Sequence, residues 1–552
     1  MTASDERPAG ARDRQRRSPA HTALGAFFVA LTAGALALLV TISANLLKSP
    51  PPALPSLGGS VIDPGCDTDR IVSLDSWMLA RLERPPVLTP KKRSWEHALG
   101  PGRQAQTALR ARLAGWPAHL LTDARALPRG PRAFAERLAR DTWRGLADLT
   151  DRANGLPLDT IAFSAGLRGG APTAARIADY TNVTNIGLHL AATVGALELG
   201  LLDRTEALRR IERVLATLGE LETDAGFFFN YYDTTSLERT SHFLSFVDSS
   251  WLTAGLMLVR MTFPELYEHC SALIAQSNFG VMYDAVAGLM SHGYYVDPRA
   301  RSRYHYGVLY TEARLGTLLA IGKGDVPEAA WFNMVRTFPA ECRWQSRAPV
   351  DVRTVEVRGH LVTAGHYRWG SLRYVPSWGG SMFEALMPTL LIDELEAAPR
   401  SLGRNGLMHA LGQRRFAMRE LRLPVWGFSP SARPDGEQYG EYGVKALGSR
   451  GYPSGPVTPH AAALAVPLIP KAAIRNLQKL AARYPVYGEY GLYDAVDPYT
   501  GAVAYKYLAL DQSMLFLSLV NHLTDHALQR RFAADPIMQR ALPLIGDEDF
   551  FH

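Results

Sequence analysis

The feature that most constrains the fold is a recurrence of helical patterns separated by long connections, running from about residue 131 to the C-terminus. Apolar residues recur with helical periodicity in at least ten segments, whereas alternating, strand-like runs are scarce. Several connections span roughly 20 to 30 residues, whereas connections in a simple bundle run about 2 to 8 residues. This pattern predicts an all-α fold in which helical hairpins form a toroid and the loops surround a cleft on one face. Periodicity alone leaves an α-solenoid open.

Apolar spacing and start and stop signals set the expected helix limits. One start is marked by Asp203 and Glu206, whose capping-box spacing predicts that Asp203 caps the helix backbone and Glu206 reaches back. The expected helices cover 132–153, 185–199, 203–221, 249–261, 265–277, 311–322, 327–337, 382–397, 403–420, 458–483, 511–523 and 527–542.

The N-terminus predicts export. An arginine-rich start precedes an uncharged apolar run from Leu24 to Ile42, extending to about Leu47, which is long enough to span a bilayer. Because the arginines precede the run, the positive-inside rule places the tail in the cytoplasm and the remaining chain in the periplasm. A cleaved signal peptide is the alternative to an inner-membrane anchor. The expected organisation is a basic tail (1–20), an anchor or signal sequence (21–47), a Pro/Gly-rich linker (48–64), an accessory helical segment (65–130) and the main domain (131–552).

Charge and cysteine usage exclude some classes of function. The chain of 552 residues has a formal net charge of +6, but its Arg and Lys residues alternate with Glu and Asp. Without a basic patch, nucleic acid is not an expected partner. Three cysteines match no zinc or redox motif. Cys270 lies in an apolar pattern and is expected to be a buried hydrophobe, although a disulfide with Cys342 stays open in an oxidising compartment.

Motifs of other enzyme classes do not occur in the sequence. It has no Gly-x-Ser-x-Gly elbow, no His-Glu-x-x-His, no phosphate-binding loop and no dinucleotide fingerprint. The loop histidines lack metal-ligand spacing. The sequence therefore gives no reason to expect a metal or another cofactor.

The long connections combine aromatic residues with acids at helix starts. Tyrosine, tryptophan and phenylalanine gather in five loops, and flat rings with a polar tip suit the faces and hydroxyl edges of sugar rings. Any single aromatic ring could instead be buried in the packing between the helices of the toroid. Four acids stand at or near predicted helix starts, where they could carry chemistry or simply cap a helix. These acids are Asp248, Glu312, Glu384 and Asp511.

Eight segments together resemble the glycoamylase-like domain family, which includes endo-β-1,2-glucanases of glycoside hydrolase family 144 and the C-terminal domain of cyclic β-1,2-glucan synthases. Two of them read Tyr-Thr-Glu-Ala-Arg-Leu at 310–315 and Ser-Trp-Gly-Gly-Ser-Met-Phe-Glu at 377–384. All eight occur in the family's order. The others lie at 184–188, 229–234, 247–249, 321–327, 425–427 and 490–495.

The resemblance implies an (α/α)6 toroid that binds a polysaccharide or oligosaccharide, with β-1,2-glucan as the first expectation. It implies that Glu312 is the general acid, that Asp248 is a candidate base and that Asp511 occupies a comparable late position. It further implies a glycan-binding set of Asn185, Asn230, Tyr232, Asp233, Tyr310, Arg314, Trp378, Glu384, Trp426, Tyr490 and Tyr493.

One departure from the family bears on mechanism. Retaining relatives carry a nucleophilic Glu in a Trp-Gly-x-Ser-Glu-Ser context, where this chain has Pro430. Proline cannot attack an anomeric carbon, so an inverting hydrolase is expected. Two alternatives stay open: an inert glycan-binding or scaffold protein of a polysaccharide system, and a lyase that uses Tyr and His as its base.

Overall fold

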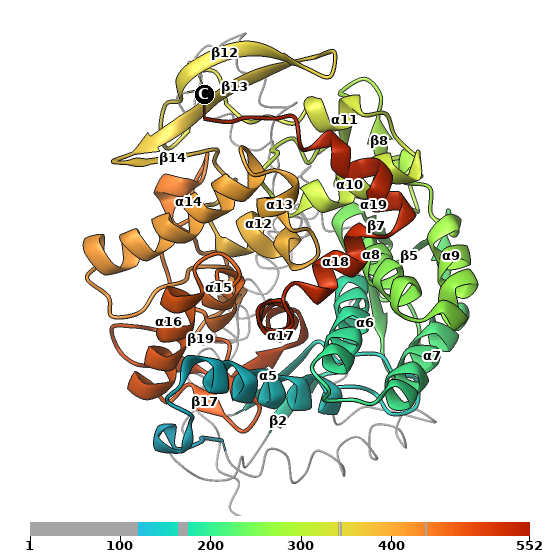
Figure 1. The fold of residues 1–552 in the computed structure, drawn as a ribbon. Coiled ribbons are helices and arrows are strands. Elements are labelled where there is room, and N and C mark those ends of the chain that lie inside the picture. The colour runs from blue at the N-terminus through green and yellow to red at the C-terminus, as the bar shows by residue number, and fades with distance from the viewer. Residues whose placement is uncertain (1–119, 164–174, 341, 343–344, 436–438, 552) are drawn as a thin grey trace, which may run out of the picture. The chain divides into compact units, whose positions relative to one another are not determined.

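The computed structural model describes residues 120–163, 175–340, 342, 345–435 and 439–551. Helices dominate these residues, as the sequence predicts (Figure 1). The expected tail, anchor, linker and nearly all of the accessory segment lie outside the described residues. Among the helices that are described, none combines the length and apolarity that a bilayer crossing requires.

Six helices of the described part form an inner ring, and five of the six junctions between neighbours are direct helix contacts. At the sixth, Arg314 of one helix donates hydrogen bonds to the carbonyl oxygens of Glu384 and Ala385 in the next. Several of these helices are buried around their whole circumference, as expected for apolar helices enclosed by others. The six are α6 (Val183–Glu198), α8 (Phe246–Thr262), α10 (Ala313–Lys323), α12 (Met382–Leu386), α15 (Pro459–Leu464) and α17 (Ala509–Leu523).

Each inner helix packs against a helix of an outer layer. The outer helices are amphipathic: in α7 (Arg204–Glu220), Ala207, Ile211, Val214 and Leu218 form one buried stripe. The first helix described, α5, packs on α17, so the start of the helical region closes the ring against its last inner helix (Figure 1). The other outer helices are α9 (Tyr267–Gln276), α11 (Ala329–Phe332), α14 (Leu402–Arg415) and α16 (Pro470–Arg483), with α5 at Pro131–Asp148.

The first turns of neighbouring inner helices lie side by side. Gly187 of α6 and Gly255 of α8 let two backbones touch, because a Cβ on Gly187 would stand 2.2 Å from the carbonyl oxygen of Trp251. A Cβ on Gly316 of α10 would meet the Ser250 hydroxyl oxygen at 2.4 Å, which joins α10 to α8 at the same level. The N-terminal ends of these helices therefore meet at one end of the ring.

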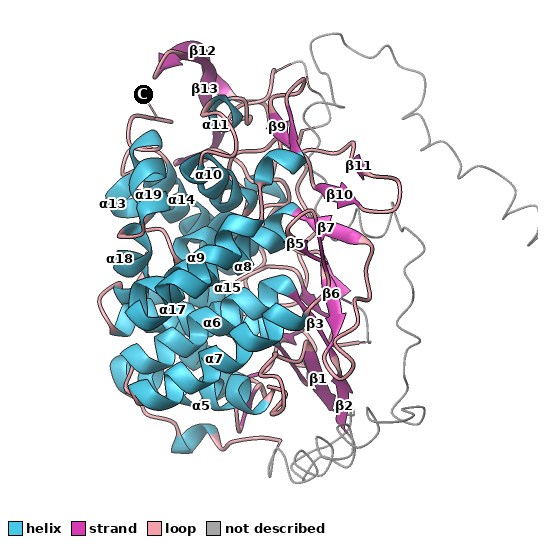
Figure 2. Cartoon of the chain, turned by 90° about the vertical axis from the view of Figure 1, so that its right-hand side faces the viewer, coloured by secondary structure: helices cyan, strands magenta, loops and turns pink. Residues whose placement is uncertain are grey.

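Short strands lie at this end of the ring, and several lead directly into inner helices (Figure 2). β3 (Tyr180–Asn182) pairs with β6 (Tyr231–Asp233) and enters α6, and β7 (Phe243–Ser245) pairs with β10 (Gly293–Tyr295) and enters α8. β21 (Lys506–Leu508) pairs with β1 (Thr160–Phe163), which also pairs with β2 (Ala175–Ala178). The pairing fixes where each inner helix begins.

A β-hairpin corrects the purely helical prediction. β12 (Val350–Val357) and β13 (His360–Trp369) form an antiparallel pair, which β14 (Leu372–Tyr374) extends. The sequence of β12 alternates valine with charged or polar residues, which is the pattern of a half-exposed strand. The fold is thus mostly helical with added strands.

Proline shortens or divides several expected helices, because it lacks a backbone N–H and clashes with the preceding turn. Pro388 ends α12 and starts a 3-10 turn, and Pro470 and Pro536 each start a new helix inside a region predicted as one. The region 327–337 holds only the short α11. The resulting pieces are α12 with α13 (Glu394–Ala397), α15 with α16, and α18 (Ala527–Ala533) with α19 (Pro536–Ala541).

Two local predictions have mixed outcomes. Asp203 caps α7 by accepting from the Glu206 backbone N–H at 2.8 Å, as predicted, but Glu206 pairs with Arg209 and Arg210 instead of completing the box. Cys270 is a buried free thiol, as predicted, and burial raises its pKa to about 12. Because Cys342 is disulfide-bonded while Cys270 is free, these two residues are not paired.

Candidate active site

Acidic side chains gather where the inner helices begin. Asp248 lies in the first turn of α8, Glu312 is the N-cap residue of α10, Glu384 lies in the first turn of α12, and Asp511 lies in the first turn of α17. The positive ends of helix dipoles favour negative charge at such positions. The structure therefore brings all four predicted acids to the same end of the ring.

Asp248 is held by a polar frame and does not cap its helix. Ser245 is the N-cap of α8 and accepts from the Asp248 backbone N–H, which leaves the carboxylate of Asp248 available. The Thr184 hydroxyl donates to Asp248 Oδ1 at 2.7 Å, and the side chains of Asn182 and Asn230 also hydrogen-bond to it. Burial raises the pKa of Asp248 despite these hydrogen bonds, so its carboxylate is a stronger base than an exposed one.

The sequence analysis missed Asp159, which lies between α6 and α17. Its Oδ1 accepts from the predicted site residue Asn185 at 3.0 Å and its Oδ2 from the Thr160 hydroxyl at 2.8 Å. Its carbonyl oxygen accepts from the backbone N–H of Ala509, where α17 begins. Burial raises the pKa of Asp159. No motif surrounds this residue, so only the tertiary structure identifies it.

Asp511 faces a second missed acid, Asp494. Both carboxyls are buried, and burial together with the charge of Asp494 raises the pKa of Asp511 well above its ordinary value. The charge of Asp159 acts on Asp511 in the same direction. His460, in the first turn of α15, lies beside Asp511, and burial lowers the pKa of its imidazole to about 3. The acids thus form a continuous set across the starts of α8, α6 and α17.

Tyrosine 231 reaches the site in place of the predicted Tyr232. Successive side chains of a strand point to opposite faces, and β6 turns the Tyr232 hydroxyl inward, where it donates to the Glu222 carbonyl oxygen at 2.5 Å. Tyr231 keeps partial exposure, and the charges of Asp248 and Asp159 together with burial raise its pKa. Tyr231 is therefore better placed than the predicted Tyr232 to contact a ligand at this end of the ring.

Arg314 and Tyr310 are structural, which corrects their assignment as glycan-binding residues. Arg314 is fully buried, and all five of its N–H donors face acceptors: the Glu394 carboxylate and the backbone carbonyls of Thr311, Glu384 and Ala385. Tyr310 is also fully buried, with its ring 4.4 Å from the Arg314 guanidinium carbon. These contacts give both side chains a structural role between α10 and α12.

Glu384 is engaged by its own loop. Its carboxylate accepts from the backbone N–H groups of Gly379 at 2.9 Å and Ser381 at 3.5 Å, and Ser381 caps α12 in return. This is a complete capping box. Glu384 therefore shapes the Gly-rich turn before α12, whereas Glu312 is buried at the start of α10 without serving as a side-chain cap.

The remaining predicted glycan contacts have different positions. Asn230 accepts from the Asn182 amide at 2.8 Å and belongs to the frame around Asp248. Asp233 instead accepts from two backbone N–H groups of its own turn. The other four are buried in the packing of the loops and the ring, and their role as glycan contacts stays a prediction: Trp378, Trp426, Tyr490 and Tyr493.

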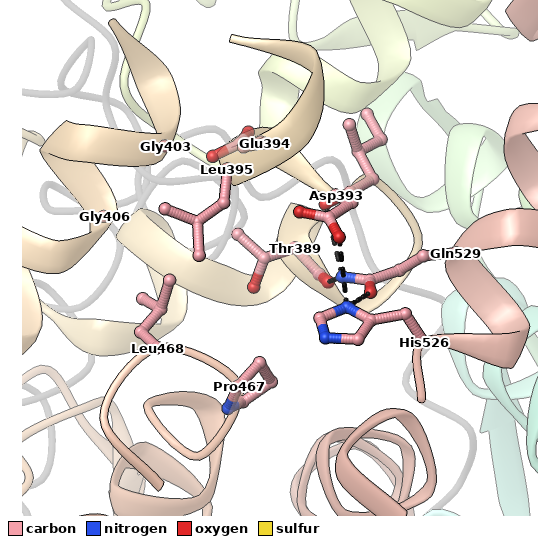
Figure 3. Close-up of a pocket in the computed structure, with 11 residues that line it drawn as sticks. Thr389, Asp393, Glu394, Leu395, Gly403, Gly406, Pro467, Leu468, His526 and Gln529 are labelled. Carbon is pink, nitrogen blue, oxygen red and sulfur yellow. Dashed lines mark hydrogen bonds and ion pairs between the residues drawn. The ribbon is translucent and has the colours of Figure 1, made fainter. Parts of the chain in front are cut away.

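A small pocket lies at the opposite end of the ring, behind the C-terminal ends of α12, α15 and α17. Figure 3 shows its lining, in which His526 forms an ion pair with Asp393 at 3.1 Å and contacts Gln529. Leu468 and Pro467 close one side. Glu394, the partner of Arg314, also lines this pocket, whereas none of the acids at the helix starts, Asp248, Glu312, Glu384 and Asp511, does so.

Residues 305–536 match the model of the Glycoamylase family, described as "Putative glucoamylase". The chain therefore carries a Glycoamylase family domain. Over 299 residues it is 30% identical to the cyclic β-(1,2)-glucan synthase NdvB of Rhizobium meliloti (strain 1021), a match that covers 51% of this chain and 9% of that protein. This chain spans only a small fraction of the synthase's length.

Solved structures of glucanases share the fold. The endo-β-1,2-glucanase of Chitinophaga pinensis, solved with sophorotriose and glucose, superposes with a TM-score of 0.57 at 16% identity, covering 76% of this chain and 99% of that one. The β-1,2-glucanase of Parabacteroides distasonis gives a TM-score of 0.59 at 15% identity, covering 76% and 61%.

Proposed function

We propose that this chain, which carries a Glycoamylase family domain, is an (α/α)6 glycoside hydrolase that cleaves β-1,2-glucan by an inverting mechanism. The observation that carries the proposal is the arrangement of Asp248 and Glu312 at the starts of adjacent inner helices, Asp248 in the first turn of α8 and Glu312 at the N-cap of α10. Inverting glycosidases use two carboxyl groups: one protonates the leaving oxygen, and the other activates water on the opposite face of the sugar.

Glu312 is the proposed general acid. Its side chain is buried where α10 begins, at the end of the ring where the other predicted acids gather. Protonating the glycosidic oxygen as the bond breaks avoids the release of an alkoxide. The proton goes to the leaving sugar, which departs as a neutral alcohol.

Asp248 is the proposed general base, acting on water directly or through a hydroxyl of the substrate. Thr184, Asn182 and Asn230 fix its orientation, and burial raises its pKa toward the range of an effective base. Tyr231 lies beside it and is partly exposed, so it is a candidate sugar contact. Asp511, enclosed with Asp494, is the less favoured base because it is more deeply buried.

Two observations support the substrate and the stereochemistry. The related structures include glucanases specific for β-1,2-linkages, one of them with sophorotriose bound. Pro430 stands where retaining relatives carry their nucleophile, and it is buried between Ser429 and Ser431, so no carboxylate occupies that position. This substitution supports inversion without a covalent intermediate.

The decisive experiment compares the wild type with Glu312→Gln on a panel of linear and cyclic glucans that includes β-1,2-glucan. Release of β-1,2-oligosaccharides, with the first-formed anomer detected by NMR in the inverted configuration, is expected from the wild type. Glu312→Gln should keep its melting temperature and its glycan binding but lose about 10²- to 10⁴-fold in kcat. Glu420→Gln, at the exposed end of the turn after α14, is the matched control.

Cleavage by Glu312→Gln at the wild-type rate would exclude it as the acid. Asp248→Asn and Asp511→Asn identify the base, because only the true base should lose turnover while glycan binding is retained. Binding of β-1,2-glucan without any product from the wild type would instead establish a glycan-binding protein, and products that absorb in the ultraviolet would establish a lyase.

We further propose that the catalytic region works in the periplasm, tethered to the inner membrane through residues 21–47. The proposal depends on the arginine-rich start and the apolar run after it. Alkaline phosphatase fused after residue 64 should be active in cells and should sediment with membranes. An inactive fusion would contradict export, and an active but soluble fusion would establish cleavage.

A further inference from the structure

Three buried residues from distant parts of the chain meet beneath the acidic end of the ring. His460 comes from α15, Asp494 from the loop before β19 (Ala495–Val496), and Asp511 from α17. Their exposed fractions are 2%, 1% and 0%. One potential ligand atom from each lies within 4.8 Å of the other two.

Most of the carboxylate oxygens in this cluster have no hydrogen-bond donor. Both oxygens of Asp511 and Oδ1 of Asp494 are buried without a partner from protein N–H or O–H groups, whereas Asp494 Oδ2 accepts from the Ala432 backbone N–H at 2.6 Å. A buried carboxylate without donors or a countercharge costs several kcal/mol. One proton shared by the two carboxyls would satisfy only two of these three oxygens.

His460 and Asp511 are spaced for shared coordination and not for a direct hydrogen bond, whereas the carboxyls of Asp494 and Asp511 lie close enough to share a proton. His460 Nδ1 and Asp511 Oδ2 are 3.6 Å apart, which is too long for a hydrogen bond. Two tetrahedral ligands about 2.1 Å from one metal ion would stand about 3.4 Å apart. The Thr458 hydroxyl lies 3.1 Å from Nδ1 and 3.3 Å from Nε2 of the same imidazole, so it can fix the orientation of the ring.

We propose that His460, Asp494 and Asp511 bind one divalent transition-metal ion, Mn²⁺ or Zn²⁺. One imidazole nitrogen and two carboxylates form a ligand set that these ions accept. The ion would add positive charge to that of Lys506, which acts on Asp494, and would join α15, α17 and the Asp494 loop beneath the acidic end of the ring. Burial keeps the imidazole neutral, as a ligand must be.

The proposal does not depend on glycan hydrolysis, because metal binding is measured without substrate. Untagged full-length protein is stripped with a chelator, dialysed and titrated with Mn²⁺, with free ion followed by electron paramagnetic resonance. Zn²⁺ is titrated separately by calorimetry. One equivalent of one of these ions should bind, and it should raise the melting temperature.

Two isosteric variants test the ligands independently. His460→Gln and Asp494→Asn should each weaken binding by at least about 100-fold, the upper end of the loss seen when an outer-shell partner is removed. His189→Gln is the matched control, because His189 is another buried, neutral imidazole on an inner helix, outside the cluster. Circular dichroism establishes that each variant is folded.

The proposal is overturned if neither ion binds the wild type stoichiometrically, which would leave a proton-sharing pair of carboxyls. It is equally overturned if the two variants, once shown to be folded, bind as tightly as the wild type does. Loss of binding in His189→Gln would place the ion elsewhere.

Discussion

Replacing Glu394 with glutamine should destabilise the ring and leave glycan binding intact. Arg314 donates to the Glu394 carboxylate from Nε at 2.6 Å and Nη2 at 3.1 Å, and the exposed fractions of the two side chains are 0% and 2%. Glu394→Gln keeps the shape of the side chain but leaves the guanidinium charge enclosed without a counter-ion. Breaking a buried pair in this way costs about 3–5 kcal/mol.

The cost translates into a measurable shift. Unfolding entropy of about 2.1 cal/mol/K per residue over roughly 430 residues gives about 0.9 kcal/mol/K, so the melting temperature should fall by about 3–6 °C. Calorimetry and urea unfolding measure the loss, and titration with β-1,2-glucan measures affinity. Glu396→Gln, exposed on the same short helix, should stay within about 0.5 kcal/mol of the wild type.

The double variant Arg314→Met with Glu394→Gln separates the charge from the packing. Removing both charges should recover part of the lost stability, because no enclosed charge remains. A Glu394→Gln protein that melts like the wild type but binds glucan weakly would refute the reasoning, since Arg314 would then be contacting the ligand.

Three further predictions concern the acidic end. Thr184→Val removes a hydrogen bond that lowers the pKa of Asp248. The apparent pKa on the acidic side of the kcat/KM profile should therefore rise by about 1–2 pH units. An unchanged profile would exclude Asp248 as the titrating base. Asp511 has a raised pKa in the folded state, so its stabilising contribution is complete below about pH 4 and is lost as pH rises through the folded pKa. With a chelator present, Asp511→Asn should therefore raise the melting temperature at pH 7.5 more than at pH 4, and the reverse order would contradict the shift. Tyr231→Phe should reduce turnover at unchanged stability. Tyr232→Phe should instead cost about 1–3 kcal/mol of stability, because it leaves the Glu222 carbonyl and the Phe229 N–H without their partner. Equal effects of the two variants on turnover would contradict the assignment.

Local pattern predicted the helical character and most helix starts. The stripe on α7 and the all-round apolarity of α8 follow directly from residue order. Proline positions were the main source of wrong boundaries, because apolar periodicity continues through Pro470 and Pro536 although the backbone cannot. The β12–β13 hairpin was missed because its alternation was outweighed by the surrounding helical pattern.

Side-chain roles were predicted less well than helices. Aromatic residues in loops can either pack inside the fold or bind a sugar, and local sequence does not distinguish the two. Trp426 and Tyr493 are buried in the structure. Strand alternation decided between Tyr231 and Tyr232, and its phase depends on the pairing of β6 with β3. The sequence suggested a binding role for Arg314 because its ion-pair partner, Glu394, lies 80 positions away and cannot be identified from local pattern.

The sequence by itself determined the helical elements and the acids at their starts, because these depend on neighbours a few residues away. Only the tertiary structure decided that Asp159 joins Asn185, that Asp494 faces Asp511 and that His460 stands beside them. The physical reason is that closing the ring of helices sets these contacts. A contact between residues on different elements, here 26, 17 and 51 positions apart, leaves no periodic trace in either segment.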